Sequence, residues 1–152
     1  MITQCSYKKG EKIMNVLLLI TPKSKVEYLQ NDFSIRQSLE KMDYHHYSAI
    51  PLLTENGEYV GVISEGDILW FAKRQNDFSL LKSEKISIND VPRNREYLTA
   101  HSYTTIEELF PIILSQNFVP IVDDRNIFIG IVTRKDILNF FYQRLTHKEK
   151  VQ

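Results

Sequence analysis

The chain has 152 residues, of which 43% are hydrophobic and 25% are charged. This length suits one domain, or two half-domains that share a core, and the composition argues against disorder. Nineteen basic residues balance nineteen acidic ones, so the excess of positive charge that nucleic-acid binding normally uses is absent.

A single cysteine, Cys5, excludes an internal disulfide and fits a reducing compartment. The longest apolar run near the start, residues 16–20, is too short for a signal peptide or a membrane span. We therefore predict a cytoplasmic protein without a membrane or nucleic-acid partner.

The chain repeats itself. The segment GVISEGDIL at residues 61–69 recurs as GIVTRKDIL at residues 130–138, which is 69 positions later. A spacing shared by several separate matches indicates a duplication. The same spacing relates three further pairs: Pro51 and Pro120, Phe71 and Phe140, and residues 27–29 and 96–98.

The first copy opens with a predicted short strand at residues 27–29. Ser34 and Gln37 have the spacing of a capping box, in which each side chain bonds the other's backbone N–H, and they predict the start of a helix. The apolar positions of that helix share one face: Ile35, Leu39 and Met42.

A hairpin and a second helix complete the first copy. Strands are predicted at residues 49–53 and 59–63, joined by a turn at Glu55-Asn56-Gly57, in which the asparagine and the glycine tolerate positive φ. The second helix is predicted to begin near Glu65, with Ser64 as its N-cap.

The second copy predicts the same elements in the same order. Its first strand is expected at residues 97–99, and Thr105 and Glu108 form the capping box of its first helix. Pro111 would break the interior of this helix, so the helix is expected to restart there. The hairpin strands, the turn and the closing helix follow: residues 119–122, residues 128–132, the turn at residues 123–126, and a helix from Arg134 with Thr133 as N-cap.

Each copy therefore has β-α-β-β-α order, which predicts a mixed α/β (α+β) fold. One copy alone leaves a sheet face uncovered, so the two copies should pack sheet to sheet. The chain divides into a lead-in (1–13), the first repeat (14–73), a polar connector (74–85), the second repeat (86–145) and a tail (146–152).

This pattern resembles the CBS domain, two copies of which form a Bateman module. The residues that carry the resemblance are the two motifs at 61–69 and 130–138, the upstream Pro51 and Pro120, and Thr21-Pro22. It is similar to stand-alone bacterial CBS pairs, and in particular to small Gram-positive ones that bind cyclic di-AMP. Three features favour that branch: Lys25-Val26, Thr133-Arg134, and the shortened approach at residues 116–119.

The resemblance implies a nucleotide site at the second motif. A carboxylate in the first turn of a helix can accept hydrogen bonds from both vicinal ribose hydroxyls, and the helix N-terminus suits phosphate. Lys25 and Arg134 are the expected phosphate partners. The predicted nucleotide-binding residues are Thr21, Lys25, Val26, Tyr47, Ser48, Ala49, Thr133, Arg134 and Asp136.

A weaker second site is predicted at the first motif. Glu65 stands there where the second motif has Arg134, and a carboxylate would repel a phosphate at short range. The second copy also has two extra residues before its first helix and two fewer after it, and both changes border this site. Its predicted residues are Ser64, Asp67, Arg93, Leu98, Asn117 and Phe118.

Simpler interpretations stand beside these. An aspartate in the first turn of a helix stabilises that helix without any ligand, by roughly 0.3–1 kcal/mol. His45-His46 lacks partners at metal-ligand spacing, so no metal and no cofactor are predicted. The aromatic residues of the closing helices favour a core or a dimer interface over base stacking: Trp70, Phe71, Phe140, Phe141 and Tyr142.

No catalytic set is recognisable, so we predict that the chain is not an enzyme. The favoured function is a regulatory module that senses an adenine nucleotide and signals to a partner protein. Cyclic di-AMP leads among the ligands, with AMP, ADP, ATP and S-adenosylmethionine as others. The alternative is a ligand-free module for dimerisation or protein interaction, and a homodimer is expected in either case.

Overall fold

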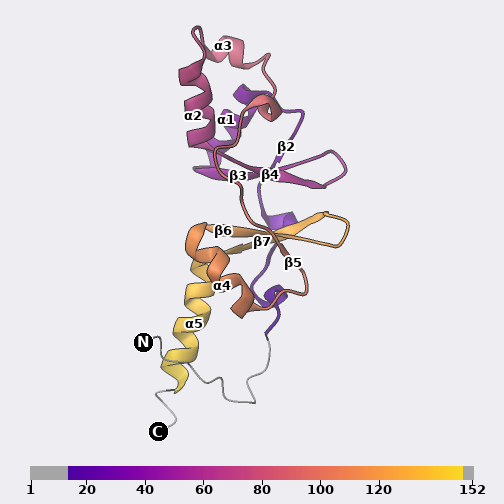
Figure 1. Cartoon of the computed structure of the whole chain (residues 1–152), viewed down its shortest axis with the longest axis vertical. Coiled ribbons are helices and arrows are strands. Elements are labelled where there is room, and N and C mark those ends of the chain that lie inside the picture. Colours follow the sequence, from indigo (N-terminus) through magenta and orange to yellow (C-terminus); the bar gives the residue numbers. More distant parts are fainter. Residues whose placement is uncertain (1–13, 149–152) are drawn as a thin grey trace, which may run out of the picture.

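The computed structural model describes residues 14–148. The predicted lead-in with Cys5, and residues 149–152 of the predicted tail, lie outside the described residues. The described chain forms two halves, each with a small sheet and its own helices, and the sheets face each other across the middle (Figure 1). The elements in chain order are η1 (Val16–Leu18), β1 (Thr21–Pro22), η2 (Lys23–Lys25), β2 (Leu29–Gln30), α1 (Ile35–His45), β3 (Ala49–Leu53), β4 (Tyr59–Ser64), α2 (Glu65–Arg74), α3 (Leu80–Ser83), η3 (Ile88–Asp90), β5 (Ala100–His101), α4 (Ile106–Ser115), β6 (Phe118–Val122), β7 (Phe128–Thr133) and α5 (Arg134–Lys148).

Each sheet is built around one of the predicted hairpins. The first sheet has the order β2-β3-β4, with β2 parallel to β3 and β3 antiparallel to β4. The second has the order β1-β7-β6-β5, with the same pairing among β5, β6 and β7. Strand β1 joins the second sheet by antiparallel pairing with β7, in which Thr21 lies opposite Ile131. The predicted mixed fold of two packed β-α-β-β-α repeats is confirmed.

The first strand of each repeat lies later than predicted. Leu29 lies opposite Leu52, and Ala100 lies opposite Ile121, so β2 and β5 begin at these residues and not at 27 and 97. The two strands are therefore 71 positions apart, whereas the hairpins are 69 apart. The letter match between residues 27–29 and 96–98 is not a structural equivalence, because the second repeat holds two extra residues before its first helix.

Both hairpin turns form where the sequence predicts them, but only one residue in each has positive φ. Gly57 has φ of 84° and its N–H donates to the carbonyl of Thr54, while Asn56 is not among the residues with positive φ. Asn126 takes the equivalent place in the second hairpin, with φ of 63°. The strand register shifts next to each turn, at Leu52/Leu53 and at Ile121/Val122.

Both predicted capping boxes form, at Ser34 with Gln37 and at Thr105 with Glu108. Helix α4 does not restart at Pro111, because it runs unbroken from Ile106 to Ser115 with the proline inside it. Pro111 is on the exposed side of the helix, so its missing N–H donor removes a bond only at the surface.

The predicted connector is partly helical. Ser79 caps the short helix α3 within it, and α3 contacts α1 of the first repeat. The predicted tail also begins inside a helix, since α5 continues to Lys148.

The two halves exchange short segments. The segment around η1, from the start of the described chain, lies against the second repeat, where the N–H of Ile106 donates to the carbonyl of Met14 (2.9 Å). The segment around η3 lies against the first repeat in the same way, through the N–H of Ile35 and the carbonyl of Ile86 (2.9 Å). Each half is therefore completed by a piece of chain that sequence order assigns to the other.

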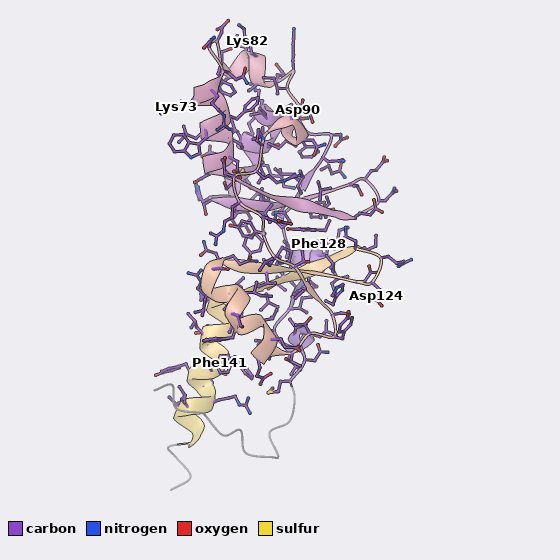
Figure 2. The ribbon with its side chains drawn as sticks, viewed as in Figure 1. Lys73, Lys82, Asp90, Asp124, Phe128 and Phe141 are labelled. Carbon is purple, nitrogen blue, oxygen red and sulfur yellow. The ribbon has the colours of Figure 1, made fainter. Side chains whose placement is uncertain are left out.

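Two hydrophobic cores result, one in each half, and each includes an exchanged residue. The first core is made of Leu29, Ile35, Met42, Ile50, Leu52, Ile63, Ile68, Ile88 and Val91. The second is made of Val16, Ala100, Leu109, Ile113, Val119, Ile121, Val132 and Ile137. Phe128, which is 1% exposed, lies where the two sheets meet (Figure 2). None of the helices within residues 14–148 is long and apolar enough to cross a membrane.

Candidate functional site

Asp136 lies in the first turn of α5, directly after strand β7. The Thr133 hydroxyl donates to Oδ2 of Asp136 (2.5 Å) and accepts from the Asp136 N–H (3.1 Å), so Thr133 is the N-cap that the sequence predicts. Among residues 14–148, no group donates a hydrogen bond to the other oxygen, Oδ1. One carboxylate oxygen is thus held in place while the second stays available for a ligand.

A pocket of about 310 Å³ opens beside Asp136. Apolar side chains of residues 18–20 form one wall, and Phe140 of α5 contributes an aromatic ring. Asn139 and Gln143 add side-chain amides from the same face of α5. This combination suits a ligand that has hydroxyl groups for the carboxylate and a flat apolar ring for the walls.

Three predicted residues of the first repeat lie at strand β7, although none of them lines the pocket beside Asp136. Thr21 pairs with Ile131 of β7, and the η2 segment with Lys25 contacts the same strand. Val26 follows as the C-cap of η2, and its N–H donates to the carbonyl of Lys23 (3.1 Å). The exchanged segment thus carries Thr21, Lys25 and Val26 to the edge of the sheet that holds Thr133.

Ser48 and Ala49 contact the first motif through their backbones. The Ser48 carbonyl accepts from the N–H of Glu65 (3.0 Å), and Ala49 lies opposite Ser64. Tyr47 is stacked on His45, with ring centroids 5.5 Å apart. A contact of these three residues with a ligand at Asp136 stays a prediction.

Arg134 points toward helix α4. Its Nε donates to the carbonyl of Ile113 (3.0 Å), and its backbone N–H donates to the carbonyl of Asn117 (2.8 Å). In this arrangement the guanidinium supports the C-terminal end of α4. To contact a phosphate, the guanidinium of Arg134 would have to give up its hydrogen bond to the carbonyl of Ile113.

Asp67 is the counterpart of Asp136 in the first motif, and both of its carboxylate oxygens accept hydrogen bonds. Oδ2 accepts from the N–H (2.9 Å) and the hydroxyl (2.7 Å) of Ser64. Oδ1 accepts from the backbone N–H (2.8 Å) and the side-chain amide (2.9 Å) of Asn94. Asp67 is only 5% exposed. Burial alone would raise the pKa of Asp67, but these four hydrogen bonds outweigh it and hold the pKa below its usual value.

Two of the remaining residues of the predicted second site, Leu98 and Phe118, are joined through Gln116. Gln116 is buried, and its side chain accepts from the N–H of Leu98 (3.0 Å) and donates to the carbonyls of Leu98 (2.8 Å) and Phe118 (2.9 Å). The ring of Phe118 also contacts that of Tyr97, with centroids 5.4 Å apart. Asn117 precedes β6, and the side chain of Arg93 lies over Gly61 of β4. Of this segment, Asn94 is the residue that contacts Asp67.

Sequence reasoning missed the residues that distinguish the two sites. Asn94 occupies one oxygen of Asp67 at the first site, while Asn139 and Gln143 line the pocket beside Asp136 at the second. The spacing of Asn139 and Gln143, three and seven positions after Asp136, puts them on the same helix face and could have indicated them. Within residues 14–148, no group of three or more His, Cys, Asp or Glu side chains could hold a metal ion.

Comparison with known proteins places this geometry in a family. The model of the CBS domain matches residues 19–73 and 88–143. Among curated proteins, L-aspartate semialdehyde sulfurtransferase of Methanocaldococcus jannaschii is 27% identical over 113 residues, which is 73% of this chain and 20% of that enzyme. Inosine-5′-monophosphate dehydrogenase of Bacillus subtilis is 28% identical over 114 residues, 72% of this chain and 21% of the enzyme. The chain thus spans about a fifth of the length of these two relatives.

Solved structures of similar size share the fold. CbpB in complex with cyclic di-AMP has a TM-score of 0.84 at 20% identity, with 92% of each chain covered. CbpB of Listeria monocytogenes, also in complex with cyclic di-AMP, has a TM-score of 0.74 at 22% identity, covering 84% of this chain and 94% of its own. CBSX2 of Arabidopsis thaliana in complex with AMP has a TM-score of 0.70 at 22% identity, covering 86% and 97%.

Three independent features agree on the family. The sequence carries two matched motifs, the structure shows two packed β-α-β-β-α halves with exchanged segments, and the family model covers both repeats. The chain belongs to the CBS domain family, as a tandem pair of CBS domains.

Proposed function

We propose that the chain is a regulatory module that binds an adenine nucleotide in the pocket beside Asp136. The observation that carries this proposal is the contrast between the two aspartates, because Asp136 keeps an oxygen available in a pocket while Asp67 has none. Cyclic di-AMP is the leading ligand, followed by AMP, ADP, ATP and S-adenosylmethionine.

The pocket offers a partner for each part of such a ligand. Oδ1 of Asp136 would accept hydrogen bonds from ribose hydroxyls, and the purine would lie against residues 18–20 and Phe140. The first N–H groups of α5, together with Lys25, would favour the phosphate. The complexes of CbpB with cyclic di-AMP and of CBSX2 with AMP support this class of ligand.

The state of Asp67 supports a single nucleotide per chain. A ribose at the first motif would have to displace both hydrogen bonds that Asn94 donates to Asp67. We therefore expect the first motif to serve a structural role.

Signalling would follow from the position of the pocket. One wall comes from the exchanged segment before β1, and the other comes from α5 of the second repeat. Both walls belong to the second half of the fold, so a ligand would favour one angle between the halves only through the predicted contacts with Tyr47, Ser48 and Ala49 of the first repeat. A partner protein would read that angle. This makes the module regulatory and not catalytic.

A second candidate function is a ligand-free dimerisation module. It is favoured by large apolar side chains that are exposed on the closing helices: Leu69, Trp70, Leu138, Tyr142 and Leu145. One protein can both dimerise and bind a nucleotide. The ligand-free function is therefore favoured only if no nucleotide changes the stability of the protein.

A thermal-unfolding screen against the five nucleotides separates the two functions. At 100 times its dissociation constant, a ligand should add about 2.7 kcal/mol of stability and raise Tm by several degrees. We expect the shift in the wild type and in Asp67→Ala, relative to the ligand-free Tm of each, but not in Asp136→Ala. No shift in the wild type with any of the five at millimolar concentration would leave dimerisation as the better account.

A further inference from the structure

The first helices of the two repeats, α1 and α4, end in different ways. Helix α1 is closed by the backbone that follows it, because His46 is left-handed (φ 55°) and its N–H donates to the carbonyls of Met42 and Asp43. The N–H of Tyr47 also donates to the Met42 carbonyl (3.0 Å). These carbonyl groups at the end of α1 are therefore satisfied within the same segment of chain.

Helix α4 ends without a left-handed residue, since Gln116, which follows it, is extended (φ −139°, ψ 155°). Side chains bond the carbonyls of its last turn instead. The hydroxyl of Ser115 donates to the carbonyl of Ile112 (2.8 Å), and Arg95 donates to the carbonyl of Ser115. The last turn, residues 112–115, holds no basic residue of its own, so arginines from other segments supply the positive charge that suits this end of a helix.

Arg134 joins the end of α4 to the second motif. Its Nε donates to the carbonyl of Ile113 (3.0 Å), and its backbone N–H donates to the carbonyl of Asn117 (2.8 Å). Arg134 is also the first residue of α5, two positions before Asp136. One side chain thus caps α4 and stands at the start of the helix that carries the open aspartate.

The first repeat lacks this connection. Glu65 stands where the second repeat has Arg134, and its N–H donates to the carbonyl of Ser48 (3.0 Å) in the way that Arg134 donates to Asn117. A carboxylate has no donor, so Glu65 cannot bond a carbonyl at the end of α1. The repeat with the open aspartate is therefore the one whose first helix is capped from its nucleotide motif.

The cap and a bound phosphate would compete for the same guanidinium. Arg134 is not among the residues that line the pocket beside Asp136, because its side chain is directed at α4. A phosphate at the start of α5 would be the stronger acceptor, since its hydrogen bonds with a guanidinium join two opposite charges, whereas a carbonyl is neutral. The bond to Ile113 would be lost when the guanidinium turns to the phosphate.

We propose that Arg134 is a ligand-sensitive cap of α4: a bound nucleotide takes its guanidinium from the carbonyl of Ile113, and the last turn of α4 loosens. This inference rests on the proposed nucleotide site and describes how that site is coupled to the rest of the fold. The loosened turn includes Leu114, which is 69% exposed, so the change reaches the protein surface. Helix α1 keeps its backbone cap, so the response belongs to the second repeat.

Hydrogen–deuterium exchange of the full chain, free and saturated with AMP or with cyclic di-AMP, tests this proposal. We expect the amides of residues 113–116 to exchange about two- to five-fold faster in the complex, the factor that corresponds to one side-chain interaction at a helix end. The amides of residues 134–140 should exchange more slowly, because the ligand covers the start of α5. A general stabilisation by ligand would slow both segments, so opposite directions are specific to the cap.

Two variants separate the cap from other contacts of the same turn. In Arg134→Ala without ligand, residues 113–116 should already exchange faster than in the wild type, and saturation with nucleotide should cause no further increase. Ser115→Ala is the matched control, because it removes another bond to a carbonyl of this turn from outside the nucleotide motif. Nucleotide should still speed exchange at residues 113–116 in this variant by the factor seen in the wild type.

The outcomes distinguish the cap from the nucleotide site. Unchanged or slower exchange at residues 113–116, in a complex whose residues 134–140 are protected, would overturn the cap and leave the nucleotide site standing. An increase with nucleotide that persists in Arg134→Ala would overturn it as well, because another contact would then loosen α4. Residues 134–140 that neither nucleotide protects would overturn the proposed function together with the cap.

Discussion

Asp67 and Asp136 occupy the same position in the two motifs, yet their environments differ. Asp67 accepts four hydrogen bonds and is buried, so its carboxylate connects α2 to the segment after η3. The side chain of Asp136 accepts only the Thr133 hydroxyl within residues 14–148. The first aspartate therefore serves stability, while the second is available for binding.

Alanine substitution should separate these roles in the absence of ligand. We expect Asp67→Ala to lower the free energy of unfolding by about 2–3 kcal/mol, because it leaves the donors of Asn94 and Ser64 without their charged acceptor. Asp136→Ala should cost about 1 kcal/mol or less, since one hydroxyl bond and the helix-dipole interaction are lost. Urea unfolding at pH 7 measures both values. Equal costs would contradict the assignment.

The lowered pKa of Asp67 predicts how its contribution depends on pH. Its pKa in the folded protein lies below the ordinary value of 3.8, so the stability it adds is fully present well above pH 3.8 and is lost as pH falls through the folded pKa. The difference in unfolding free energy between the wild type and Asp67→Asn should therefore shrink below pH 4. Urea unfolding of both proteins from pH 7 to pH 3 measures it, and a difference that grows toward acid would contradict the assignment.

At this scale the sequence predicted the aspartates and their caps but not their partners. Each cap lies three residues before its aspartate, so Ser64 and Thr133 are visible in the motif itself. Asn94 is 27 residues from Asp67 and Gln116 is 18 from Leu98, and both pairings depend on the path of an irregular segment. No periodic pattern marks such contacts.

The pairing of strand β1 with strand β7 requires a glycine in β7. A Cβ at Gly130 of β7 would lie less than 3.0 Å from the carbonyl oxygen of Thr21 and from the side chain of Ile20. The close approach of these two backbones is therefore possible only without a side chain at this position.

Gly130→Ala should displace β1 and lower the free energy of unfolding by about 1–3 kcal/mol, because a backbone oxygen cannot move away as a flexible side chain could. Gly66→Ala in α2 is the matched control. Its Cβ would meet ordinary contacts at 3.7 Å and beyond, so helix propensity should raise stability by up to about 1 kcal/mol. Thermal unfolding measures both, and a Gly130→Ala protein as stable as the wild type would show that β1 is not held as described.

Local signals predicted most elements well. The hairpin strands, the capping boxes and the starts of α2 and α5 follow from alternation, caps and turn residues that lie close together in the sequence. The two-residue strands β2 and β5 have no such signal, because their place is fixed by pairing with β3 and β6. Pro111 was misjudged for a related reason, since only the fold shows that it lies on the exposed side of α4.

At the scale of the whole molecule, the exchanged segments join the two repeats. Val16 is buried in the second core and Ile88 in the first, so neither half has a complete core made only from its own repeat. The hairpin tips add a further link, in which the N–H of Tyr59 donates to the carbonyl of Asn126 (2.9 Å). The duplication is visible in the sequence, but this exchange depends on contacts far apart in the chain.

We therefore expect the two repeats to unfold together. Trp70, the one tryptophan of the sequence, lies in α2 and reports on the first half, whereas far-UV circular dichroism reports on both. Urea transitions followed by the two methods should have the same midpoint. A tryptophan transition that is separate from the dichroism transition would mean that the halves fold independently.

Calorimetric titration of cyclic di-AMP and AMP into the wild type, Asp136→Ala and Asp67→Ala tests the central claim most directly, because it gives both affinity and stoichiometry. The account predicts one nucleotide per chain in the wild type, the same stoichiometry in Asp67→Ala, and an affinity at least about ten-fold weaker in Asp136→Ala. Two nucleotides per chain, or an unchanged affinity in Asp136→Ala, would contradict it.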